Sequence, residues 1–184
     1  MPQESKRIAA LLLTHPSQAA WETALKSDNF LQKKTLATAR RQSRLIRNRL
    51  QTLQDTGLEL VSTGNQEVSV QMLLVSAIKH SQLLADFIRS VYQQAVKAYE
   101  DKLAAKHWDS FIEECSKRDP AVAGWSDSTK AKLFQVLVRM LAEAKFLESS
   151  RSMRLTPQAL HPEVIRYLKS HSETEVLLLL EARS

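Results

Sequence analysis

Several residue types are scarce in this 184-residue chain, and each scarcity excludes a class of structure or chemistry. The 3 glycines, Gly57, Gly64 and Gly124, stand too far apart to form a glycine-rich loop around a phosphate group. The single cysteine, Cys115, cannot form an intramolecular disulfide, which is consistent with a reducing compartment. No apolar run approaches the roughly 18 residues of a membrane span, and the first residues lack the apolar core of a signal peptide. We therefore expect a soluble, cytoplasmic protein.

Metal-binding and catalytic motifs are also missing. Cys115 has no catalytic motif around it, and the acidic pairs at 100–101 and 113–114 are most simply solvated helix positions. The histidines show no metal-ligand spacing with each other or with the cysteine. They are His15, His80, His107, His161 and His171. We therefore expect no metal, no cofactor and no catalytic residue, and we interpret the chain as a non-enzymatic protein.

The chain is instead rich in apolar and charged residues. Hydrophobic residues make up 43% and charged residues 25%, with only 5 prolines, which is typical of a globular, helix-rich protein. The formal net charge is +6, and its distribution is uneven. Residues 1–57 contain 10 Lys and Arg against 4 Asp and Glu, whereas residues 58–184 contain 16 of each. The whole excess lies in the N-terminal third, which favours a localised anionic partner.

Residues 35–53 predict one amphipathic helix. Thr35 can cap its first turn, because the hydroxyl can accept a hydrogen bond from a free backbone N–H group. Apolar residues at alternating spacings of three and four place a stripe along one face, with Ser43 as its weakest member and Leu45 outside it. The stripe consists of Leu36, Ala39, Ser43, Ile46, Leu50 and Leu53.

Basic side chains crowd the same segment. Between Asp28 and Asp55 there are seven basic residues and no acidic one: Lys33, Lys34, Arg40, Arg41, Arg44, Arg47 and Arg49. Solvated helices usually alternate acids with bases, because like charges four residues apart, such as Arg40 and Arg44, repel each other. The arginine fork suits phosphate oxygens and base edges, so these residues predict contact with nucleic acid. The alternative is a solvated face, or arginines that pair with acids elsewhere in the fold.

We expect three regions along an all-α chain. In residues 1–57, helices at 5–13, 17–25 and 35–53 follow the order of a small helix-turn-helix-like DNA-binding unit. The connection before the third helix is longer than the turn of an ordinary helix-turn-helix, and a three-helix bundle without a binding role is the alternative. Residues 58–125 predict a central helical bundle. It would contain a short connector at 57–64 and helices at 67–80, 83–99 and 107–117, the last with Cys115 on its buried face.

Residues 126–184 predict a C-terminal helical unit. A strong start signal at 126–129 precedes a helix to about residue 147, and Pro162 suits the first position of a helix at 162–169. Residues 152–156 suggest a short strand or wing, which would make a second, winged helix-turn-helix-like unit. Its candidate DNA-binding residues are Lys130, Lys132, Arg151 and Arg154. The apolar run at 176–180 is open between a strand and a final helical turn.

The chain resembles the BrxA family, the small all-helical component of bacteriophage exclusion (BREX) systems that protect bacteria against phage. The resemblance runs from about Ser5 to Leu168, through ESKRIAALLL, NFLQKKTLATARRQSRLIRNRLQTL and WSDSTKAKLFQVLVRMLAEAKFLE. Its most specific parts are the segments at 35–53 and 128–144. The resemblance implies a monomeric, all-α protein with two helix-turn-helix-like units beside basic surface, which binds double-stranded DNA and works with other BREX proteins.

We therefore expect a DNA-binding accessory protein that contacts mainly phosphates and binds largely without sequence specificity. Asn48 and Gln51 have the chemistry to read adenine, but a solvated or capping role fits them better. The alternative is a helical adaptor that docks its basic helix on an acidic protein partner. A contact with membrane headgroups is a weaker third option.

Overall fold

The computed structural model describes residues 2–27, 31 and 35–181. Contacts within the chain form two compact units: unit 1 comprises residues 1–80 and 161–171, and unit 2 comprises residues 81–160 and 172–184. This grouping differs from a division into three consecutive regions, because a segment after residue 160 returns to pack with the N-terminal helices. Throughout the described residues the regular elements are helical, as predicted, and the β features are two isolated bridges.

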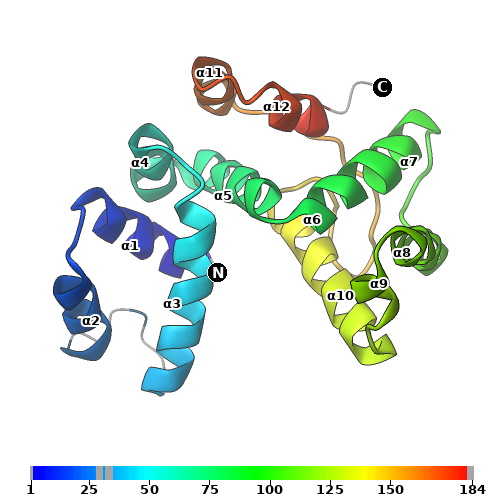
Figure 1. Cartoon of the computed structure of the whole chain (residues 1–184). Coiled ribbons are helices and arrows are strands. Elements are labelled where there is room, and N and C mark those ends of the chain that lie inside the picture. Colours follow the sequence, from blue (N-terminus) through cyan, green and yellow to red (C-terminus); the bar gives the residue numbers. More distant parts are fainter. Residues whose placement is uncertain (1, 28–30, 32–34, 182–184) are drawn as a thin grey trace. The chain divides into compact units, whose positions relative to one another are not determined.

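Unit 1 contains the basic helix, α3, together with five other helices among its described residues (Figure 1). Its helices are α1 (Pro2–Leu13), α2 (Gln18–Ser27), α3 (Leu36–Leu50), α4 (Asp55–Thr63), α5 (Gln66–His80) and α11 (Pro162–Ser170). Helix α1 packs on α3, α4 and α5, and α2 packs on α3. Helix α3 therefore has one face against the rest of the unit and leaves the other face outside the core.

The local sequence of α3 accounts for its start and its buried stripe. The side chain of Thr35 caps the helix, because its Oγ1 accepts a hydrogen bond from the backbone N of Thr38 at 3.2 Å. Ser43 is 1% exposed, and its hydroxyl donates to the backbone carbonyl of Arg40 at 3.0 Å, so this buried hydroxyl is satisfied. The prediction is wrong for Leu36, the first residue of α3, which is 41% exposed. The other stripe members, Ala39, Ile46, Leu50 and Leu53, are buried as predicted.

The prediction of a connector at 57–64 is wrong, because α4 occupies most of this segment. Gly57 lies inside the helix and is buried against α11. A Cβ added at Gly57 would lie 2.8 Å from the Tyr167 ring, so the glycine permits a close approach of two helices and does not mark a chain break. The Tyr167 hydroxyl also accepts a hydrogen bond from the backbone N of Gln54 at 3.1 Å, which fixes α11 against the start of α4.

Helix α11 begins as predicted and also packs on α5. The side-chain oxygen Oε1 of the buried Gln71 accepts a hydrogen bond from the backbone N of His161 at 2.8 Å. Pro162 occupies the first turn of α11, where its missing N–H group costs nothing. These contacts, between residues about 90 positions apart, explain why α11 belongs to unit 1.

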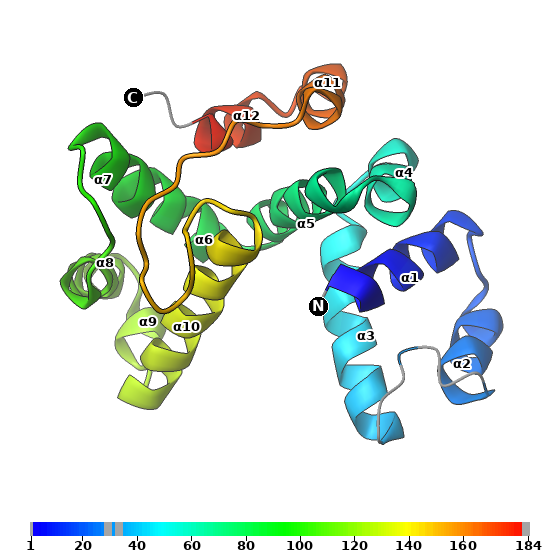
Figure 2. The ribbon, with the colours of Figure 1, turned by 180° about the vertical axis from the view of Figure 1, so that it is seen from behind.

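Unit 2 is also helical (Figure 2). Its helices are α6 (Gln82–Phe87), the π-helical turn η1 (Ile88–Tyr92), α7 (Gln93–Lys97), α8 (Ala105–Arg118), α9 (Pro120–Ala123), α10 (Asp127–Glu143) and α12 (Thr174–Leu180). Phe87, Trp108, Phe111 and Phe134 form an aromatic cluster from three of these elements. Cys115 is buried on the inner face of α8, as expected.

The structure shows the conformation of the two C-terminal segments at 152–156 and 176–180. The apolar run at 176–180 is helical, and the side-chain Nε2 of Gln93 donates to the carbonyls of Leu178 and Leu179 at 2.8 and 3.1 Å. In place of a strand at 152–156, the segment after α10 is irregular and forms the isolated bridges, one of them between Leu147 and Leu155. Among the described residues, no helix has the length and apolar character needed to cross a membrane.

Candidate nucleic-acid interface

The outer face of α3 is the candidate interface. Successive residues of an α-helix are rotated by about 100°, so Arg41, Arg44 and Asn48 point away from the buried stripe. All three side chains are exposed. Arg47 and Arg49 lie at the two borders of the stripe and are half-buried. The five arginines of α3 therefore do not form one uniform surface.

The exposed arginines of α3 have few acidic partners. Arg40 lies 3.4 Å from Glu22 of α2, with the two side chains 50% and 36% exposed, so water screens much of this attraction. Arg41 and Arg44 form no ion pair with any residue that the structure describes. The interpretation that these arginines are neutralised within the fold therefore fails for the two most outward positions.

Arg47 is anchored by an aromatic side chain. Its guanidinium carbon lies 4.5 Å from the centroid of the Trp21 ring, and Trp21 itself is buried with 4% of its surface exposed. This cation–π contact links α2 to α3. The Nε atom of Arg47 is buried and has no hydrogen-bond partner within the described residues. Arg47 therefore does not project freely from the helix, because its planar group packs on the tryptophan.

Arg49 is also held against the protein. Burial lowers the pKa of Arg49, because removing the guanidinium from water disfavours its charged form. Arginine nevertheless stays protonated in proteins, so the residue keeps its positive charge. Its Nε atom is buried without a hydrogen-bond partner in the part of the chain that the structure describes. Arg49 contributes to the positive potential of α3, but it is less available for a direct contact than Arg41 or Arg44.

The other candidate residues near α3 are Lys33, Lys34, Asn48 and Gln51. Lys33 and Lys34 lie outside the described residues. Asn48 forms no side-chain hydrogen bond with a described residue and is therefore solvated, whereas Gln51 is the C-cap residue of α3 through its backbone N–H group. Neither observation assigns a base-reading role.

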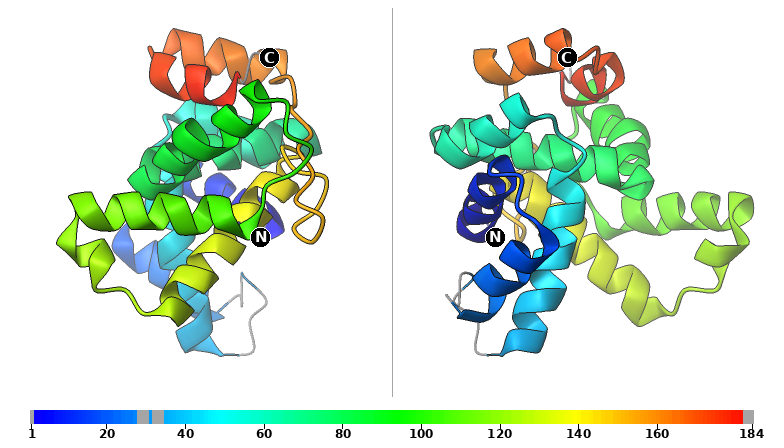
Figure 3. Two further views of the ribbon diagram at one scale, coloured as in Figure 1. Left: turned by 90° about the vertical axis from the view of Figure 1, so that its right-hand side faces the viewer. Right: turned by 60° about the vertical axis from the view of Figure 1, so that its left-hand side comes forward.

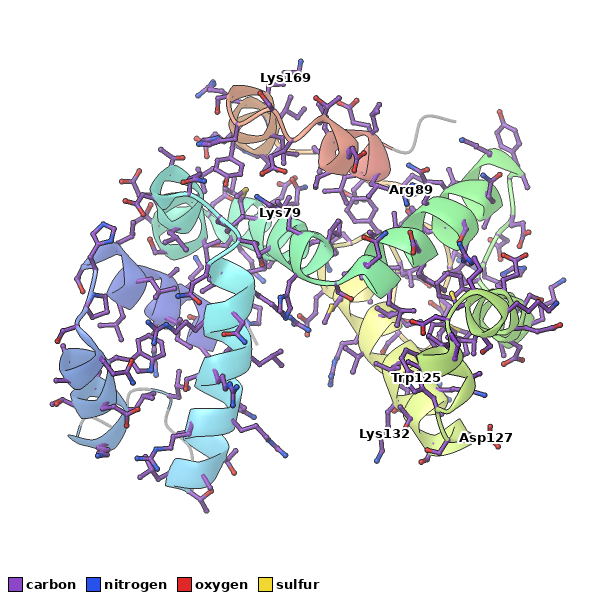
Figure 4. The ribbon with its side chains drawn as sticks, viewed as in Figure 1. Lys79, Arg89, Trp125, Asp127, Lys132 and Lys169 are labelled. Atoms are coloured by element: carbon purple, nitrogen blue, oxygen red, sulfur yellow. The ribbon has the colours of Figure 1, made fainter. Side chains whose placement is uncertain are left out.

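The candidate residues of the second surface lie in unit 2 and are partly paired. Lys130 lies 4.0 Å from Asp127, and Arg154 lies 3.4 Å from Asp101 and 4.0 Å from Glu148. Lys132 is exposed and points away from α10 (Figure 4), and Arg151 is also exposed. Acids from unit 2 therefore offset two of the four cations.

The charge balance differs between the units. Unit 1 contains 13 Lys and Arg against 7 Asp and Glu, and unit 2 contains 13 of each. Unit 1 includes two exposed basic residues of α11 that sequence reasoning missed, Arg166 and Lys169, and Lys169 points away from the helix (Figure 4). No local signal marks them, because their membership of the basic unit depends on how α11 packs.

Known proteins resemble this chain over nearly its whole length. A family model described as BrxA matches residues 1–172. A BREX protein BrxA from Paramagnetospirillum magneticum is 36% identical over 178 residues, which cover 97% of this chain and 89% of that protein. A second BREX protein BrxA, from Escherichia coli O9:H4, is 32% identical over 183 residues, covering 100% and 86%. The crystal structure of an uncharacterized protein from Magnetospirillum magneticum matches with a TM-score of 0.89 and 34% identity, covering 99% of this chain and 93% of that chain.

Proposed function

The chain belongs to the BrxA family and is a component of a bacteriophage exclusion (BREX) defence system, and from this premise we propose that it binds double-stranded DNA through unit 1. The contacts would be made mainly to phosphates and largely without sequence specificity. The supporting observation is the outer face of α3, where Arg41 and Arg44 are exposed and unpaired among the described residues. The proposal assigns the protein a binding role and no catalytic one.

Each part of α3 has a distinct role in this proposal. Arg40, Arg41 and Arg44 contact phosphates directly, because their forks are exposed and suit phosphate oxygens. Arg47 and Arg49 add positive potential from the borders of the stripe. Lys33 and Lys34 precede the helix in the sequence and are included as further candidate phosphate contacts. Binding of this kind weakens steeply with salt, because each neutralised phosphate releases counterions.

The direct test is binding to a labelled random-sequence duplex, with single-stranded DNA as a competitor. We expect the double variant R41E/R44E to bind at least about tenfold more weakly than the parent, because reversal adds repulsion to two lost phosphate contacts. The matched control is K132E/R151E, which makes the same change of charge in unit 2. Circular dichroism of both variants checks that the fold is intact.

An unchanged affinity in the folded R41E/R44E variant would contradict the proposal. An equal loss in both variants would show that unit 2 also carries a DNA-binding surface. We place that surface second because Lys130 and Arg154 already have acidic neighbours.

A protein-adaptor role is the second candidate, and one observation favours it. Leu45 lies outside the buried stripe of α3 and is 41% exposed on the same helix as the exposed Arg41 and Arg44, and arginine is enriched in protein interfaces. In this case α3 would dock on an acidic surface of another BREX protein. The adaptor role predicts stable co-purification with that protein after nuclease treatment. Elution of the protein alone after that treatment would count against it.

A further inference from the structure

A cleft of about 350 Å³ lies in unit 2, between α8 and the continuous helix formed by η1 and α7. The connection at 98–104 joins these helices (Figure 3, left). The apolar part of its lining consists of Val91, Ala95, Ala98 and Phe111. The polar part consists of Ser90, Gln94, Glu100, His107, Ser110 and Glu114. No residue proposed to contact DNA lines the cleft.

One wall of the cleft is an irregular helical turn. The backbone N of Gln93 bonds to the carbonyl of Ile88, five residues earlier, which is the hydrogen-bond pattern of a π-helix. Ser90 and Val91 belong to this turn and line the cleft. Such turns are rare and occur frequently at functional sites, because the wider turn shifts side chains from their ordinary helical positions.

A strained, exposed aromatic residue follows the same helix. Tyr99 has a φ of 54° and is 82% exposed, at a helix end where glycine is usual. The backbone N of Tyr99 bonds to the carbonyl of Val96, and that of Glu100 bonds to the carbonyl of Ala95. The fold gains little packing from a ring in this position. Tyr99 stands between two cleft-lining residues in the chain, and the face of an aromatic ring attracts cations.

The charge of the lining is negative. Glu100 and Glu114 line the cleft, and no lysine or arginine does. Nδ1 of His107 accepts a hydrogen bond from the backbone N of Ala104 at 3.2 Å, which places the ring proton on Nε2, 3.4 Å from Glu100 Oε2.

Three polar side chains of the lining are free to bind. Gln94, Ser110 and Glu114 form no side-chain hydrogen bond or ion pair with any described residue. Together with the apolar part of the lining, they provide an anion, an amide and a hydroxyl beside a surface for an aliphatic chain. A volume of about 350 Å³ is near the lower limit for ligand pockets and suits one long side chain.

We propose that this cleft binds an arginine or lysine side chain of a protein partner. The cationic group would lie between Glu114 and Glu100, and its methylene chain would pack on Val91 and Phe111. The site is independent of the DNA-binding proposal, because it lies in the other unit and has the opposite charge.

The test is a titration of the full chain, labelled with ¹⁵N, with Nα-acetyl-arginine N-methylamide, followed by NMR. We expect saturable shifts of the amide signals of Ser110, Phe111 and Glu114, with a dissociation constant on the order of 1–10 mM. The matching citrulline derivative has nearly the same shape without the charge, and we expect it to bind at least about fivefold more weakly. Glu114→Gln should weaken binding of the arginine derivative at least about threefold. The matched control is Glu113→Gln, since Glu113 pairs with Lys117 at 2.8 Å and does not line the cleft.

Three results would overturn the proposal. They are an absence of saturable shifts, equal binding of the citrulline derivative, and equal effects of Glu113→Gln and Glu114→Gln. Spermidine distinguishes the source of the cation. If it binds the cleft more tightly than the arginine derivative, the site takes a free polyamine and the protein-partner assignment is wrong. The amide spectrum of each variant verifies its fold, and R41E/R44E should bind the arginine derivative like the parent.

Discussion

The two units contain equal numbers of basic residues and use them differently. In unit 2, acids stand beside the cations: Arg89 lies 2.9 Å from Asp86, and Lys117 lies 2.8 Å from Glu113. In unit 1, Arg41 and Arg44 share an outward face and have no ion-pair partner among the described residues. A surface suited to an anionic partner is therefore distinguished by basic side chains that lack acidic partners, and not by the number of basic residues.

Truncation of a buried leucine in either unit should have the largest effect on stability, and it should affect duplex binding only in unit 1. Leu50 in unit 1 and Leu141 in unit 2 are both 0% exposed. Each change to alanine should lower the free energy of unfolding by about 2–5 kcal/mol, because it leaves a cavity. We expect L50A to weaken duplex binding, since it loosens the support of α3, and folded L141A to bind like the parent. Urea unfolding and duplex titration of both variants measure this. Loss of binding in L141A with α3 intact would show that unit 2 is required.

Alanine substitutions at one glycine in each unit should differ in their effect on stability, because the two glycines are packed differently. A Cβ at Gly57 would collide with the Tyr167 ring at 2.8 Å, whereas a Cβ at Gly124 would meet its nearest atom at 3.6 Å. We expect G57A to lower the free energy of unfolding by about 1–3 kcal/mol and to weaken the packing of α11 on α4. G124A should be neutral or stabilise by up to about 1 kcal/mol, because alanine tolerates its φ of −76°. Thermal unfolding of the pair is the measurement, and equal effects would contradict the close approach of α4 and α11.

The hydroxyl of Tyr92 in unit 2 should make a smaller contribution to stability, and this contribution should depend on pH. Tyr92 is fully buried and donates to the Phe146 carbonyl at 3.0 Å, and burial raises the pKa of Tyr92 well above its ordinary value. The unfolded chain ionises this tyrosine near pH 10, whereas the folded chain keeps it protonated. Its contribution to stability is therefore complete below about pH 10 and is lost as the pH rises further.

The variant Y92F tests this assignment. It should lower the free energy of unfolding by about 1 kcal/mol at neutral pH, because the Phe146 carbonyl loses its hydrogen-bond donor. Above about pH 10 the difference between Y92F and the parent should shrink, since phenylalanine does not ionise. Urea unfolding at several pH values measures both. A difference that stays constant with pH would contradict the buried, protonated state of Tyr92.

Local patterns in the sequence predict elements that local forces determine. The cap at Thr35 and the buried stripe of α3 follow from a hydroxyl at a helix start and from apolar spacing. The same reasoning misplaces Gly57, because its role depends on Tyr167, more than a hundred residues later in the chain. A glycine that allows two helices to touch and a glycine that ends a helix look alike in sequence.

The candidate site shows the same limit. The positive charge of α3 is visible in the sequence, but the division of its arginines is not. Arg47 is half-buried because Trp21 comes from another helix, and no spacing within α3 reveals that contact. The exposed basic residues of α11 join unit 1 only through tertiary packing. The residue types of a site can thus be read locally, whereas their availability depends on the fold.

The salt dependence of duplex binding tests the central claim most directly. The parent and the neutral variant R41Q/R44Q would be titrated with one random-sequence duplex over a series of salt concentrations. If both arginines contact phosphates, the slope of log affinity against log salt should be shallower in the variant by about 2. An identical slope, with the fold intact by circular dichroism, would contradict the assignment of the outer face of α3 as the DNA-binding surface.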